Sequence, residues 1–402
     1  MRNSSTKGHA RLVVVVACLL LARVSLAQTG SEAPNLPEET PSHDSGRGGS
    51  TSRPDFNLYL PEGEFDLRVR RLIRNVLFEG QVKYKFVDGD VSTFLRYKYY
   101  ARSYTYRLGV FDSIEFGSIE SSSEDFERTR GALLLLEVPV SPNRRYLALI
   151  ERDALAFGDV SNVDHDLDNI FVKLGVLVGT PFDERLNALV GEKRGRTTPV
   201  LTAYREFGPY GIGFGAAVTH GLDTAGGDFD YTKLELEGVK KFDLARNRLI
   251  VTRFHFGTML RKDEIRQADE EIERYSTPGY EYFRLGGRDA LKGVDDGIRG
   301  SDKIHVTNEY FFPIFLARDH KTWKLSWNEL YGVAYVGAGN VGFSTNTATE
   351  LGDYIVDAGL GVEAALRYRS HRIYLAAVFA QTVVDRDGFS NNELRFSVRT
   401  SR

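Results

Sequence analysis

Six of the eight histidines are the side chains in this sequence that are best suited to acid–base or metal chemistry. Nucleophilic catalysis needs a base beside a nucleophile, with a third group that orients the base. The sequence shows no such motif around these histidines, and isolated histidines on strands are more often wall residues. We therefore expect no catalytic residue, no cofactor and no enzymatic activity; a hydrolase remains an alternative that would need such a pair. The histidines are His165, His220, His255, His305, His320 and His371.

One short stretch brings histidine and aspartate close together in the sequence. It reads "VDHDLDN", from Val163 to Asn169, and it contains the residue types that bind metal ions. A calcium loop alternates its ligands and has a glycine at its sharp turn, and this stretch has neither feature. We expect a solvated acidic loop here and no metal site.

A longer stretch, from Leu285 to Phe315, combines glycines, charges and aromatic residues. It reads "LGGRDALKGVDDGIRGSDKIHVTNEYFFPIF". The first half is flexible and polar, and the second half alternates as a strand does. The stretch matches neither a phosphate-binding loop nor a metal-ligand spacing. Its role therefore depends on the compartment and on the elements around it.

The first 27 residues have the features of a cleaved secretory signal peptide. A positively charged start is followed by an apolar run, Leu12 to Ala22, and by the small residues of Ser25-Leu26-Ala27. Arg23 makes the apolar run too short for an uncleaved membrane anchor. Cys18 is the single cysteine of the chain, so the mature protein is expected to form no disulfide and no thiolate metal site.

The composition suits many short aromatic strands joined by tight turns. The chain has 39 Gly, 20 Tyr and 25 Phe but only 2 Met. Its formal net charge of −3 gives no reason to expect nucleic acid as a partner. After the signal peptide, no apolar run is long enough for a transmembrane helix. An exported chain of this kind can span a membrane only as a closed β-barrel.

Two regions precede the main run of expected strands. Residues 28–62 are rich in Ser, Pro, Gly, Glu and Thr, which indicates a disordered linker. Residues 66–142 have the pattern of a small α+β unit, with strands at Arg74 to Gly80 and at Gly131 to Val140. Apolar residues three and four apart predict a helix over 94–108, although the same residues also alternate as in a strand.

From residue 143 to residue 402, alternating apolar and charged residues predict strands of about ten residues. Thr232 to Phe242 is one example, with Leu234 and Leu236 on one face. A soluble sandwich would bury such a face, whereas a transmembrane antiparallel barrel would turn it toward lipid. The export signal, the strand lengths and the aromatic excess favour the barrel. The exception is "GTPFDERLNALVGEK", where a short helix is expected.

The stretch from Leu285 to Phe315 resembles the signature of the outer-membrane barrel-assembly superfamily, the BamA/TamA-like bacterial surface antigens. That signature joins a glycine pair, a Leu-Arg-Gly-aromatic run and a strand with Asn, Glu and Pro. A second element of the family is matched by "YVGAGNV" in the following strand, which contains Gly337 and Gly339. The residues that match the first signature are Gly286, Gly287, Leu291, Lys292, Gly293, Val294, Asn308, Glu309 and Pro313.

The resemblance implies two folded parts. Residues 66–142 are similar to a single polypeptide-transport-associated (POTRA) repeat, and residues 143–402 would form the outer-membrane β-barrel. The family barrel has sixteen strands, whereas we count about 11–12 in this chain. Either the barrel is smaller, or residues 66–142 supply further strands instead of a repeat.

Three residues depart from the family pattern: Lys292 replaces an arginine, Val294 an aromatic residue and Gly337 an acidic residue. The resemblance implies that the loop returns into the lumen, with its basic residue tied to acidic residues of the wall. Lysine cannot form the bidentate fork of arginine. We expect Lys292 to pair weakly with Glu309, worth about 0.5–1 kcal/mol across a wet lumen. Asn308, Gly337 and Gly339 would be further docking partners; a solvated extracellular loop is the alternative.

The resemblance implies a protein of the bacterial outer membrane that assembles, inserts or translocates polypeptides. Its expected partners are outer-membrane lipid, unfolded client chains that add a strand to a sheet edge, and other assembly or periplasmic proteins. A passive pore or structural barrel is the alternative, because it needs only the alternating strands.

Overall fold

The computed structural model describes most of the chain from Ser52 to Ser401. The described ranges are 52–60, 64–85, 90–101, 103–116, 125–141, 144–159, 163–179, 212–222, 225–244, 247–260, 281–286, 290–294, 298–322, 325–343, 353–368, 371–384 and 392–401. The predicted signal peptide, residues 28–51 of the predicted linker and the helix predicted within residues 179–193 lie outside them, except for Gly179.

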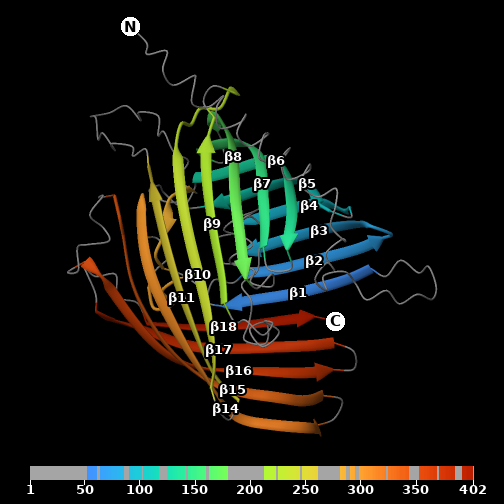
Figure 1. The fold of residues 1–402 in the computed structure, drawn as a ribbon, viewed down its shortest axis with the longest axis vertical. Helices are drawn as coiled ribbons and strands as arrows, with labels where there is room; N and C mark the ends of the chain where they lie inside the picture. Colours follow the sequence, from blue (N-terminus) through green and yellow to red (C-terminus); the bar gives the residue numbers. More distant parts are fainter. Residues whose placement is uncertain are drawn as a thin grey trace.

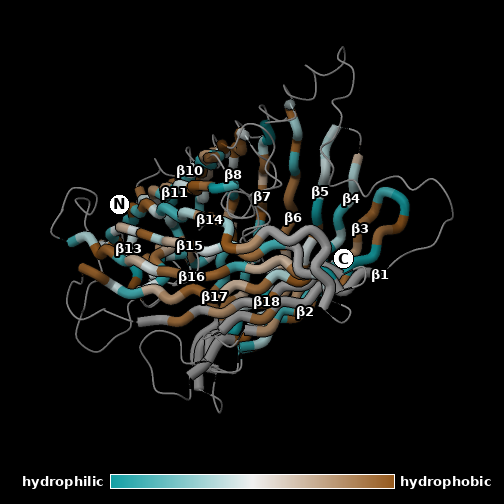
Figure 2. The backbone as a smooth tube through the Cα atoms, turned by 90° about the horizontal axis from the view of Figure 1, so that it is seen from below, coloured by the Kyte–Doolittle hydropathy of each residue, from teal (hydrophilic) through white to brown (hydrophobic). Residues whose placement is uncertain are grey.

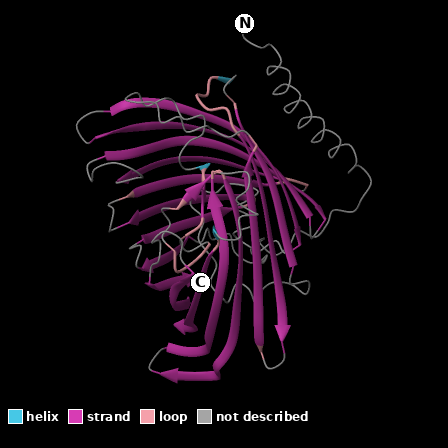
Figure 3. Ribbon diagram, turned by 90° about the vertical axis from the view of Figure 1, so that its left-hand side faces the viewer, coloured by secondary structure: helices cyan, strands magenta, loops and turns pink. Residues whose placement is uncertain are grey.

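Sixteen antiparallel strands form one closed barrel, in which each strand pairs with its neighbour and β1 closes on β18 (Figures 1 and 3). The barrel strands are β1 (Ser52–Leu60), β2 (Glu64–Ile73), β3 (Val76–Lys85), β4 (Val91–Tyr100), β5 (Thr105–Phe116), β6 (Asp125–Ser141), β7 (Arg144–Asp159), β8 (Val163–Gly179), β9 (Ile212–Gly221), β10 (Thr232–Leu244), β11 (Arg248–Met259), β14 (Asp302–Thr322), β15 (Leu325–Gly342), β16 (Ile355–Tyr368), β17 (His371–Val384) and β18 (Asn392–Ser401). The short strands β12 (Phe283–Arg284) and β13 (Arg299–Gly300) form a separate pair.

Burial alternates along the strands because successive side chains point to opposite faces of a sheet. On β9, Ala217 and Thr219 are buried toward the inside, whereas Phe214 and Val218 are exposed on the outside. The same alternation of hydrophobic and hydrophilic residues is visible along the tube in Figure 2. Large apolar side chains therefore cover the outer face, as the barrel interpretation predicted.

The helix predicted over 94–108 is wrong, and so is the POTRA-like repeat predicted for residues 66–142. These residues supply β2 to β6 of the barrel. On β4, Phe94 and Arg96 are buried inside, while Leu95 is 65% exposed outside. Gly109, the residue directly after the predicted helix, lies in the middle of β5 and pairs with Arg96. These extra strands also explain why about 11–12 strands were too few.

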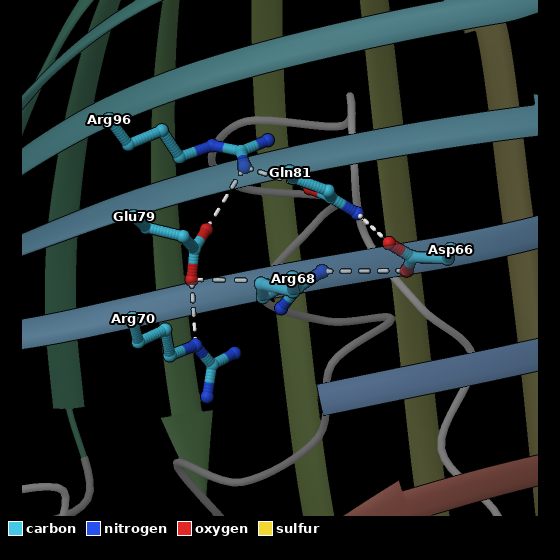
Figure 4. Close-up of polar contacts among 6 residues, drawn as sticks. All are labelled: Asp66, Arg68, Arg70, Glu79, Gln81 and Arg96. Atoms are coloured by element: carbon cyan, nitrogen blue, oxygen red, sulfur yellow. Dashed lines mark hydrogen bonds and ion pairs between the residues drawn. The ribbon is translucent and has the colours of Figure 1, made fainter. Parts of the chain in front are cut away.

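An inward-facing polar network confirms that β2, β3 and β4 form part of the barrel wall (Figure 4). Glu79 on β3 accepts hydrogen bonds from Arg70 and Arg96, at 2.8 and 3.0 Å. Gln81 donates to Asp66 at 2.8 Å and accepts from Arg96 at 2.9 Å. Pairing of opposite charges makes this buried polar surface tolerable inside the barrel.

Two segments that were predicted as loops are strands. Residues 52–60 of the predicted linker form β1, which pairs with β2 from Ser52–Arg71 to Tyr59–Glu64. Their polar composition, with a proline at position 54, favoured a linker, but pairing with the neighbouring strand stabilises a strand here. The "VDHDLDN" stretch opens β8, where Asn169 is fully buried and Asp168 pairs with Arg152 at 2.7 Å.

Among the described residues, no helix has the length and hydropathy needed to cross a bilayer.

Candidate functional site: the segment that returns into the barrel

The segment between β11 and β14 packs against the inner face of six neighbouring strands. Its described residues are 281–286, 290–294 and 298–301. β12 pairs with β13 through Phe283–Gly300 and Arg284–Arg299, and a bridge joins Gly286 to Leu291. These pairs fold the segment back on itself. The described residues of this segment are those for which a lumen-returning loop was predicted.

The base of the segment is held by Lys233 on β10. The Lys233 side chain is 1% exposed, and its Nζ donates to the backbone oxygen of Glu281 at 2.5 Å and to Glu281 Oε2 at 3.1 Å. The same ammonium lies 4.4 Å from the centre of the Phe283 ring. Gly257 on β11 makes room for this ring, because a Cβ at that position would lie 2.2 Å from it.

The tip of the segment is held by three consecutive strands. Asp357 on β16 accepts a hydrogen bond from the Gly293 N–H at 2.8 Å, and Thr382 on β17 donates to the Gly293 oxygen at 2.6 Å. The Tyr335 hydroxyl on β15 accepts from the Lys292 N–H at 3.3 Å and lies 3.0 Å from Asp357 Oδ1. Backbone groups of the tip are therefore satisfied by side chains of the wall.

The predicted pair of Lys292 with Glu309 is present in the structure. The Lys292 ammonium donates to Glu309 Oε1 on β14, and it also lies 4.6 Å from the centre of the Tyr335 ring. The two charged side chains are 14% and 12% exposed, so the pair is more shielded from solvent than the sequence suggested.

Apolar side chains complete the contact between the segment and the wall. Leu285, Leu291 and Val294 have no exposed surface, and they belong to one buried cluster. Glycines of β15 make room for two of them: a Cβ on Gly337 would lie 2.7 Å from Leu291, and one on Gly339 would lie 2.7 Å from Leu285. The other members of the cluster are Met259, Phe283, Val341 and Ile355.

The structure brings together most, but not all, of the predicted site residues. Gly286, Leu291, Lys292, Gly293 and Val294 lie in the returning segment, and Glu309, Gly337 and Gly339 contact it. Gly287 lies outside the described residues. The prediction for Asn308 is wrong. Asn308 follows the outer face of β14 and accepts a hydrogen bond from Thr252 at 2.7 Å, because neighbours on a strand point to opposite faces.

Sequence analysis missed four residues of the barrel wall that hold the segment. Asp357 and Thr382 come 64 and 89 residues after Gly293, the residue that they bond. Lys233 comes 48 residues before Glu281. Tyr335 was part of the second matched element but was given no role. Among the described residues, no three His, Cys, Asp or Glu side chains gather closely enough to hold a metal ion.

We expect the Lys292–Glu309 pair to contribute to the stability of the barrel. A hydrogen bond between charged groups contributes about 1.5–3 kcal/mol, so Lys292→Glu should lower the free energy of unfolding by at least this amount. Adding Glu309→Lys should restore much of the loss, because the opposite charges then meet again. Urea titration of the four proteins in lipid vesicles measures the coupling, and purely additive losses would show that the two side chains act independently.

Comparisons with known proteins agree on the fold alone. No protein-family model matches the sequence, and no curated protein matches it. BamA from Haemophilus ducreyi, in a crystal structure lacking POTRA domains 1–3, has a TM-score of 0.60 at 14% identity, over 96% of this chain and 78% of that chain. CdiB from Escherichia coli has a TM-score of 0.62 at 9% identity, over 89% of this chain and 64% of that chain.

A second CdiB structure, from Acinetobacter baumannii, has a TM-score of 0.54 at 11% identity, over 88% of this chain. This chain spans 59% and 64% of the two CdiB chains, so each of them contains further structure. The sixteen-stranded antiparallel barrel described here thus has the fold of the BamA and CdiB barrels.

Proposed function

We propose that this protein inserts or translocates polypeptides at the bacterial outer membrane, and that a client chain binds at the seam between β1 and β18. One observation carries the proposal. The pairing of β1 with β18 extends only from Asn57–Arg399 to Leu60–Phe396 among the described residues. By contrast, β17 and β18 pair from Arg372–Ser401 to Gln381–Asn392.

The short seam leaves strand edges that a client can extend. Residues 52–56 of β1 pair with β2, and residues 392–395 of β18 pair with β17. Neither group belongs to the described pairing between β1 and β18. A strand edge offers backbone donors and acceptors to an added strand with little dependence on its sequence. Pro54 lies within this part of β1, and proline is confined to edges because it lacks an N–H. No covalent step is required.

The outer face supports placement in a membrane. Large apolar side chains are exposed around the barrel, which would be unfavourable in water and suits contact with lipid. Examples from different parts of the wall are Leu95, Ile150, Leu360 and Leu394, which are 65%, 52%, 67% and 63% exposed. Outer-membrane lipid is therefore the first partner that we propose.

A disulfide across the seam tests the proposal. Leu58 and Val398 are direct partners in the register, and opposed residues of antiparallel strands lie at a distance that a disulfide can span. In a Cys18→Ser background, oxidation of Leu58→Cys/Val398→Cys should reduce assembly of a urea-denatured outer-membrane barrel protein by about tenfold or more, equivalent to about 1.4 kcal/mol. Proteoliposomes with and without reductant provide the measurement.

The matched control keeps Val398→Cys but links this cysteine by a disulfide to β17, the other neighbour of β18. Leu375 and Val398 are partners within the longer β17–β18 register, so Leu375→Cys/Val398→Cys should leave assembly unchanged after oxidation. Equal activity of the oxidised seam variant and its reduced form would exclude a role for seam opening. Ion conductance without client assembly in either form would instead favour the passive pore.

A further inference from the structure

We propose that Asp357 is a positioning residue that holds the tip of the returning segment and thereby places Lys292 against Glu309. Asp357 lies on β16, and its side chain has no exposed surface. Its two carboxylate oxygens contact different partners: Oδ2 accepts from the Gly293 N–H at 2.8 Å, and Oδ1 lies 3.0 Å from the Tyr335 hydroxyl. A buried carboxylate that orients two donors fixes their relative position.

Asp357 acts on Lys292 through the backbone of the tip. The Tyr335 hydroxyl that contacts Asp357 also accepts from the Lys292 N–H at 3.3 Å. The peptide groups on both sides of the Lys292 Cα are therefore held by Asp357, directly or through Tyr335. The Lys292 side chain then extends over the Tyr335 ring to Glu309. Without this hold, the long and flexible lysine side chain would start from a mobile backbone.

The neighbouring wall is shaped around the Asp357 carboxylate. Gly337 on β15 is the direct partner of Asp357 in the register. A Cβ on Gly337 would lie 2.5 Å from Asp357 Oδ1, 2.4 Å from the Tyr335 hydroxyl and 2.7 Å from Leu291. All three distances are shorter than side-chain contacts allow, so the site accommodates one carboxylate, and the residue on β16 supplies it.

The next strand adds a second contact to the same glycine. Thr382 is the register partner of Asp357 on β17, and its hydroxyl donates to the Gly293 oxygen at 2.6 Å. A Cβ on Gly293 would lie 2.8 Å from the backbone of Gln381. The tip must therefore carry glycine at this position to approach β16 and β17 closely enough for both bonds.

The reactivity of the Lys292 amine reports whether the tip is held. An amine that is paired and largely buried reacts slowly with a water-soluble acylating ester, whereas a released lysine reacts at the rate of a solvated one. Asp357→Ala leaves the buried Gly293 N–H without its acceptor and leaves the Tyr335 hydroxyl with only the more distant Ala290 oxygen, at 3.3 Å. This loss should raise the acylation rate of Lys292 by about tenfold or more. Mass spectrometry of the full chain in lipid vesicles gives this rate relative to Lys83 on β3.

A conservative variant distinguishes positioning from a general loss of stability. Asp357→Asn keeps a side-chain oxygen that can accept from the Gly293 N–H. It should therefore keep the acylation rate of Lys292 within about threefold of the rate in the original protein. Asp66→Ala is the matched control, because Asp66 is equally buried on β2 and lies in the network of Figure 4.

Asp66→Ala should leave the Lys292 rate unchanged. An unchanged rate in Asp357→Ala, or an Asp357→Asn variant that reacts as fast as Asp357→Ala, overturns the proposal. All variants are first checked for the heat-modifiable migration of a closed barrel. The importance of the tip for client assembly rests on the proposed function and is measured separately. A released tip with normal assembly would support the positioning role and refute a role of the tip in assembly.

Discussion

Residues 66–142, expressed alone, will not form a soluble folded domain. This segment contains nearly all of β2 and the whole of β3 to β6, which in the protein pair with β1 on one side and with β7 on the other. Cutting it out exposes both edges and leaves the inner residues Phe94 and Leu133 without the rest of the buried cluster. Far-UV circular dichroism should show no helix, and heating should give no cooperative transition in aqueous buffer.

The control for this fragment is the chain from residue 28 to residue 402, refolded in detergent or lipid. It should show a strand spectrum and a heat-modifiable band, because in the closed barrel every strand has a neighbouring strand on both sides. A soluble, monomeric and cooperatively melting fragment with a helical spectrum would refute the assignment of residues 66–142 to the barrel and restore the POTRA-like repeat.

The periodicity of residues 94–108 shows why the sequence favoured the wrong element. Apolar residues occur on both faces of the barrel here: Phe94 is buried inside, whereas Tyr97 contacts the outward-facing Phe78 ring at 5.5 Å. When both faces of a strand carry aromatic residues, a spacing of three joins opposite faces and a spacing of four joins residues on the same face, so both spacings occur without a helix. The spacing typical of a helix is therefore present in the sequence, but these residues do not form one face of a helix in the structure.

β1 was missed for a different reason. Residues 52–60 contain a proline and several polar residues, and their local composition favours a loop. Their strand conformation comes from pairing with β2, the next strand in the sequence, and with β18, which is brought to them only when the barrel closes. Composition indicates only the local conformational preference of a segment. It gives no information about a partner such as Arg399, which pairs with Asn57 although more than 300 residues separate them in the sequence.

Some contacts of the returning segment could likewise be predicted from the sequence, and others could not. Lys292 and Glu309 were predicted as a pair because a known pattern contains both residue types at this spacing. Asp357, Thr382 and Lys233 belong to strands that no local pattern connects to the segment. Their assignment required the register, which places Gly337 opposite Asp357 and Asp357 opposite Thr382. Only the closed barrel brings these positions to one point on its inner wall.

Lys233→Met will cause the largest loss of stability among single substitutions at the returning segment. The Lys233 ammonium lies 3.1 Å from Glu281 Oε2 and 3.8 Å from Glu235 Oε2, and both carboxylates are at most 7% exposed. Methionine fills a similar volume but leaves these two buried charges without their cation. Removing one partner of a buried ion pair costs about 3–5 kcal/mol, and we expect this decrease in the free energy of unfolding.

Lys240→Met is the matched control, because Lys240 belongs to the same strand but lies on the alternate face, 5.5 Å from the centre of the Phe242 ring. Its loss should cost less than about 1 kcal/mol. Urea titration in lipid vesicles, followed by the heat-modifiable band, measures both variants. Glu281→Gln should restore part of the stability of Lys233→Met, since the amide keeps the shape of the side chain and removes one of the two buried charges that Lys233 contacts. If Lys233→Met costs no more than Lys240→Met, or if Glu281→Gln restores nothing, Lys233 does not anchor the base of the segment, and the apolar contacts of Phe283 and Leu285 must hold it instead.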